Sequence, residues 1–120
     1  MKRGIWLTYD LGVKGDYNNL YAWLDDHGAI ECGNNLAFLY YEAITAHKDE
    51  EFINCIRAEL KERIKIEPGN RIYIIRAAQD DGKKTIKGTF LIGKRKELNN
   101  YKFFFNISSP CNYNVGGDSY

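Results

Sequence analysis

Asp10 is the residue in this sequence that is best placed to do chemistry. It ends the apolar stretch over residues 4–10, and a loop with two glycines follows, so its carboxylate is expected at the mouth of a strand. It can act there as a functional group, or it can accept backbone N–H groups of its own loop in an Asx-type turn. His27 and His47 lack a metal-ligand spacing, and residues 12–15 lack the GK[ST] ending of a phosphate-binding loop.

The basic residues of the second half form another candidate site. Residues 1–51 hold nine acidic and four basic side chains (net −5), whereas residues 52–120 hold seven acidic and thirteen basic ones (net +6). A polyanion such as nucleic acid would meet this half first, on an expected electrostatic track of Lys83, Lys84, Lys87, Lys94, Arg95 and Lys96. Phe90, near Lys87 and Lys94, adds a ring that can stack on a base. The alternative is a solvated strand face that binds no polyanion.

Strands and helices alternate along the chain and must position these residues. The predicted elements are a strand over 4–10, a helix over 17–27, two strands within 29–42, a helix from 49 that ends before 67, and strands over 71–76 and 85–92. Asp16 is a good N-cap for the first helix, and acidic residues open the second helix while basic ones close it. Gly88 is expected to form a β-bulge. Residues 101–107 are either one more strand or an apolar strap on the sheet.

The order strand–helix–strand–strand–helix–strand predicts the fold class. It is the α+β, ferredoxin-like split βαβ sandwich, here βαββαβ plus one or two C-terminal strands, with two helices on one face of an antiparallel sheet. We expect a single domain over residues 1–107. A flexible tail is expected over 108–120, where Ser, Pro, Asn and Gly gather.

The second face of this sheet is rich in aromatic and aliphatic residues, and no remaining helix is available to cover it. An exposed apolar patch of that size usually marks an interface. We therefore expect a symmetric homodimer that packs sheet to sheet, with Trp6 and Thr8 at the interface. The alternative is a monomer in which residues 101–107 fold back over the sheet.

Two short motifs carry a resemblance to a known family. The strand ending Thr8-Tyr9-Asp10-Leu11 and the helix start at residues 15–20 resemble the small CRISPR-associated ferredoxin-fold proteins, which include metal-dependent nucleases, integrase adaptors and VapD-like ribonucleases. The similarity in element order covers residues 4–76. It implies that Asp10 and the same residue of a second subunit hold Mg²⁺ for phosphodiester cleavage. The chain departs from the family pattern in its long tail and in having no arginine soon after Asp10.

Two functions remain as hypotheses. One is a Mg²⁺-dependent endonuclease for RNA or DNA that uses Asp10 and the basic track. The other is a non-catalytic dimeric adaptor, or a nucleic-acid-binding module, of a defence or mobile-element system.

The three cysteines lack a metal-binding spacing and are expected to be reduced thiols of a cytoplasmic protein. No apolar run approaches the roughly 18 residues that a membrane span needs.

Overall fold

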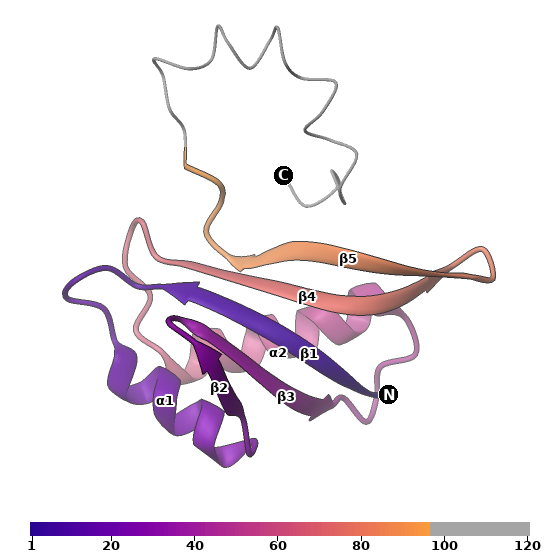
Figure 1. Cartoon of the computed structure of the whole chain (residues 1–120), viewed down its shortest axis with the longest axis horizontal. Coiled ribbons are helices and arrows are strands. Elements are labelled where there is room, and N and C mark those ends of the chain that lie inside the picture. Colours follow the sequence, from indigo (N-terminus) through magenta and orange to yellow (C-terminus); the bar gives the residue numbers. More distant parts are fainter. Residues whose placement is uncertain (97–120) are drawn as a thin grey trace, which may run out of the picture.

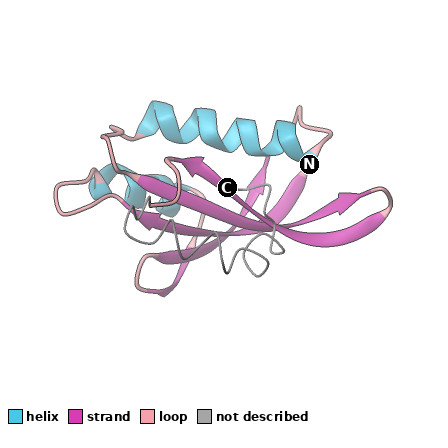
Figure 2. Cartoon of the chain, turned by 90° about the horizontal axis from the view of Figure 1, so that it is seen from above, coloured by secondary structure: helices cyan, strands magenta, loops and turns pink. Residues whose placement is uncertain are grey.

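The computed structural model describes residues 1–96 and folds them into a sheet with a layer of helices on one face (Figures 1 and 2). The elements are β1 (Lys2–Asp10), α1 (Tyr17–Asp26), β2 (Ile30–Gly33), β3 (Leu36–Glu42), α2 (Asp49–Arg63), β4 (Arg71–Asp80) and β5 (Lys83–Ile92). The strands form one antiparallel sheet in the order β2-β3-β1-β4-β5. The predicted α+β class, the antiparallel sheet and the two helices are confirmed, and β5 adds a fifth strand beside β4.

β1 is the central strand, and its alternation sets the two faces of the sheet. Ile5, Leu7 and Tyr9 are buried and belong to the single core cluster that includes apolar residues of both helices. The intervening residues point to the opposite face, where Trp6 is 41% exposed. Successive side chains of a strand alternate between faces, so one strand supplies both the core and the open surface.

Both helices begin where the sequence predicts. The Asp16 side chain accepts the backbone N–H of Asn19 at 3.4 Å, so the expected N-cap of α1 is confirmed. α1 ends one residue before the expected end, with His27 as its C-cap and Gly28 beyond it at a φ of 64°. At the start of α2 the Glu51 carboxylate accepts two backbone N–H groups, which fixes the first turn.

The hairpin of β4 and β5 is longer than the sequence analysis predicted. β4 continues four residues past 76 to Asp80, because its partner strand pairs with it as far as the turn at Asp81 and Gly82. The hairpin therefore extends beyond the N-terminal start of β1 (Figure 1). The predicted bulge at Gly88 is wrong, since Gly88 pairs regularly with Ile75. The register instead shifts opposite the step from Ile72 to Tyr73.

Two predictions concern residues beyond this range. The strand or strap at 101–107 and the tail at 108–120 lie outside the described residues, so the domain boundary at 107 stays a prediction. Within residues 1–96, neither helix is long and apolar enough to cross a membrane.

Candidate nucleic-acid interface

Asp10 lies at the end of β1, as predicted, and its carboxylate is engaged by its own loop. Oδ1 accepts the backbone N–H of Gly12 at 3.1 Å, and Oδ2 accepts a hydrogen bond from Nη2 of Arg71 at 3.2 Å. The Gly12 N–H, followed by the Arg71 guanidinium, holds the pKa of Asp10 below its ordinary value. The Asx-type turn, one of the two alternatives that the sequence left open, is thus present, and Arg71 adds an ion pair across the β1–β4 register.

The described residues around Asp10 do not supply a metal site by themselves. Its side chain remains 53% exposed, but the nearest charged partner is a cation rather than a second carboxylate. Across the described part of the chain, no three His, Cys, Asp or Glu side chains gather closely enough to hold a metal ion. Mg²⁺ prefers several oxygen ligands. A metal at Asp10 would therefore need ligands from outside these residues.

The six basic residues of the expected track fall into two groups at opposite ends of β5. Lys83, Lys84 and Lys87 lie near the hairpin turn, whereas Lys94, Arg95 and Lys96 follow the last residue of the strand. A strand of ten residues spans about 30 Å at the usual rise. The structure therefore does not bring the six residues together into one patch.

The second basic group joins Asp10 and Arg71 at one corner of the sheet. Lys94, Arg95 and Lys96 line a hollow of about 570 Å³ together with these two residues. A smaller hollow of about 320 Å³ also contains Asp10 and Arg71 and continues onto the sheet, where Thr8, Tyr73 and Phe90 line it. The two hollows share the Asp10–Arg71 pair, so the basic corner is continuous with the open face of the sheet.

The open face carries a set of aromatic rings that the helices do not cover. Trp6 of β1 packs against Phe38 of β3 with ring centroids 4.9 Å apart, and Phe38 meets Tyr40 edge to face at 5.2 Å. On the β4–β5 side, Tyr73 and Phe90 form another edge-to-face pair at 4.8 Å. Strand register places Trp6 opposite Phe38, and Thr8 opposite Tyr73, so both predicted interface residues lie among these rings.

Two glycines let some of these rings lie down on the sheet. A Cβ at Gly88 would come within 2.1 Å of the Tyr73 hydroxyl, and a Cβ at Gly4 within 2.8 Å of the Phe38 ring. Each ring therefore occupies the space that a side chain at the glycine position would need. Since the Phe38–Tyr40 and Tyr73–Phe90 pairs are edge to face, at most one ring of each pair can lie along the sheet with its face available to stack on a base.

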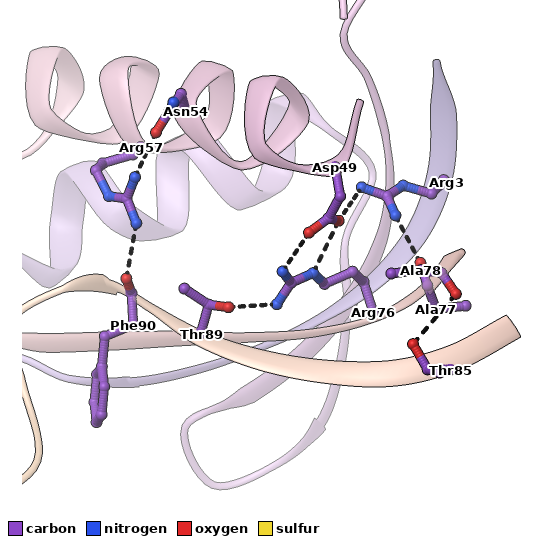
Figure 3. Close-up of polar contacts among 10 residues, drawn as sticks. All are labelled: Arg3, Asp49, Asn54, Arg57, Arg76, Ala77, Ala78, Thr85, Thr89 and Phe90. Atoms are coloured by element: carbon purple, nitrogen blue, oxygen red, sulfur yellow. Dashed lines mark hydrogen bonds and ion pairs between the residues drawn. The ribbon is translucent and has the colours of Figure 1, made fainter. Parts of the chain in front are cut away.

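The helix layer holds the strand that carries Phe90. Arg57 of α2 donates from Nε to the carbonyl of Leu91 at 2.9 Å and from Nη2 to the carbonyl of Phe90 at 3.0 Å (Figure 3 shows the second). These are the residues beside the register shift of β5, where regular ladder bonds are interrupted. In the close-up, the Phe90 ring points away from α2 and toward the open face.

Sequence reasoning identified Trp6, Thr8 and Phe90 but missed that Phe38 and Tyr73 join them. The signal was present in the strand alternation, since each aromatic residue occupies the same face as Trp6 once the pairing is known. The pairing itself is not readable from one sequence, because register depends on which strands become neighbours.

Comparison with family models, curated proteins and solved structures found no match to this chain.

Proposed function

We propose that this chain is a non-catalytic module that binds single-stranded nucleic acid on the open face of its sheet. The observation that carries the proposal is the aromatic face itself, with the Trp6–Phe38 and Tyr73–Phe90 pairs on four of the five strands. Bases stack on such rings with little regard to sequence, at about 1–3 kcal/mol per base. Within residues 1–96, neither helix lies over this face.

The charges around the face support the same partner. Arg71, Lys94, Arg95 and Lys96 stand at the corner where the Tyr73–Phe90 pair ends, so a strand stacked on the rings would bring its phosphates toward them. Lys84 lies on the open side of the hairpin at the far end. A backbone that crosses the sheet would thus meet cations at both ends, and its affinity would fall as salt rises.

The second candidate is the Mg²⁺-dependent endonuclease of a homodimer. Asp10 favours it, because its carboxylate is half exposed, stays ionised and lies on the face through which two copies would pair. The metal would have to displace Arg71 and take a ligand from the second Asp10. We rank this candidate below the first, because the Asp10 carboxylate already has two hydrogen-bond partners within its own chain.

The family resemblance and the finer fold class belong to the same proposal. Both helices link strands that are not neighbours, since β3 separates β1 from β2 and β1 separates β3 from β4. This connectivity supports a ferredoxin-like fold with β5 appended. We accordingly propose a cytoplasmic protein related to the small CRISPR-associated ferredoxin-fold group, acting as an adaptor or binding module.

Fluorescence of Trp6 offers a direct test. The chain has two tryptophans, and Trp23 is fully buried, so a base stacked on the sheet should quench only Trp6. We expect saturable quenching by a short single-stranded oligonucleotide, with affinity that falls steeply with salt. Tyr73→Ala should weaken binding about 5- to 150-fold, the equivalent of one stacked base.

The matched control is Tyr21→Ala, which removes a 44% exposed tyrosine from α1, away from the open face. It should bind like the wild type. A concentration-dependent dimer that blocks quenching, and that Trp6→Glu dissociates, would show instead that a second copy occupies the face. Metal-dependent cleavage that is lost in Asp10→Ala would establish the endonuclease.

A further inference from the structure

A hollow of about 830 Å³ lies on the other side of the molecule from the basic corner, between the start of α2 and the β4–β5 hairpin. Arg3, Lys48, Lys84 and Lys87 contribute to its lining, and the acidic residues in the lining are Asp49 and Glu50. Its size lies within the range of about 300–1,000 Å³ that is usual for small-molecule sites. The longer hairpin, which sequence analysis did not predict, supplies one wall.

Asp49 and Arg3 of the lining, together with Arg76 behind them, carry more positive than negative charge. Asp49 accepts from Nε and Nη2 of Arg76, at 3.2 and 2.6 Å, and from Nη2 of Arg3 at 2.8 Å (Figure 3). The Arg76 side chain is 3% exposed and that of Arg3 is 18% exposed. Two guanidinium groups therefore share one carboxylate, and one positive charge of this trio is left uncompensated in a region with little water.

Arg3 also has a hydrogen-bond donor without an acceptor. Its Nη1 donates to the carbonyl of Ala77 at 2.6 Å and its guanidinium lies 4.0 Å from the centre of the Phe52 ring. Its buried Nε, however, has no partner among the described residues. A buried N–H without an acceptor destabilises the fold. An anion in the hollow would offset the excess charge of Arg3 and Arg76.

We propose that this hollow binds a phosphomonoester of nucleotide size, with the phosphate facing Arg3 and the lysines of the rim. Arg3 presents its guanidinium from the sheet, while Lys48 and Lys84 approach from α2 and from the hairpin. A doubly negative phosphate suits such a cluster, because charge-assisted hydrogen bonds from guanidinium and ammonium groups are among the stronger ones in proteins. Lys84 is the one residue that this hollow shares with the proposed nucleic-acid surface, and AMP binding here does not depend on nucleic-acid binding there.

The test is a titration of the full chain with AMP at low ionic strength. Binding is measured by calorimetry and by the shifts of amide signals in NMR spectra. We expect saturable one-to-one binding, with the shifts confined to residues 47–51 and 77–87. Lys48→Glu/Lys84→Glu should weaken it at least tenfold. Both lysines are exposed, so the variant should fold. The control Lys14→Glu/Lys61→Glu makes the same change in net charge at exposed sites outside the hollow and should keep wild-type affinity.

Further controls test whether the phosphate is the group that is recognised. They also test whether AMP binds at this hollow or at the open sheet face. Adenosine, which lacks the phosphate, should not bind, and inorganic phosphate should compete with AMP. Trp6→Leu should leave AMP affinity unchanged. The proposal is overturned if AMP gives no saturable shifts, if adenosine binds equally well, or if the two double variants lose affinity to the same extent.

Discussion

Asp49→Asn should destabilise the fold strongly, because it removes the carboxylate that neutralises a buried arginine. The change keeps the size of the side chain and deletes only its charge. Arg76 would then hold a 97% buried guanidinium without a carboxylate beside it, while it keeps its hydrogen bond to Thr89 at 2.7 Å. Breaking a buried ion pair on one side costs about 3–5 kcal/mol. We expect the lower end, about 3 kcal/mol, since asparagine still offers one acceptor oxygen.

The assay is urea unfolding of the wild type and two variants at neutral pH. With a typical slope of about 1–3 kcal/mol per molar urea, Asp49→Asn should lower the midpoint by roughly 1–3 M. Glu50→Gln is the matched control, because it removes an exposed charge from the same helical turn. Its cost should be limited to the helix-dipole contribution of about 0.3–1 kcal/mol. If Asp49→Asn cost no more than Glu50→Gln, the reasoning would be refuted.

The pH dependence of the unfolding free energy gives a second test of the ion pairs that Asp49 makes with Arg76 and Arg3. Burial opposes the ionisation of Asp49, but hydrogen bonds from Arg76 and Arg3 outweigh it and lower the pKa of the folded state. A lowered pKa contributes stability that is full above the unfolded value of about 3.9 and is lost as the pH falls through the folded value. The stability difference between wild type and Asp49→Asn should therefore narrow only in that acidic window. A difference that narrowed toward neutral pH would contradict this assignment.

Three further changes test the site and its support. Gly88→Ala should displace the Tyr73 ring, whose nearest carbon atoms lie 2.6 Å from the added Cβ, and should weaken oligonucleotide binding as measured by Trp6 quenching. Arg57→Ala removes two hydrogen bonds to β5 carbonyls and should lower the free energy of unfolding by about 1–3 kcal/mol, with faster amide exchange along β5 than elsewhere. Asp10→Asn should tighten nucleic-acid binding, because it removes a negative charge beside the basic corner; gel retardation at matched salt would show the opposite if Asp10 were essential.

The local elements were readable from the sequence because their causes are local. Asp16 caps α1 through a residue three positions away, Gly28 ends that helix, and the acidic first turn of α2 marks its start. The α+β class and the antiparallel sheet then followed from the order of these elements.

The candidate sites were decided by contacts between distant parts of the chain. Asp10 lies 61 positions before Arg71 in the sequence, so no local pattern could show that this carboxylate is paired. The basic track is nearly continuous in the sequence, but the structure splits it into two groups. The two groups lie at opposite ends of β5, and an extended strand holds them far apart. A glycine within a strand suggested a bulge at Gly88, yet Gly88 pairs regularly and leaves room for the Tyr73 ring of the neighbouring strand. Residue types thus determined the elements and their faces, and tertiary register alone decided which side chains meet.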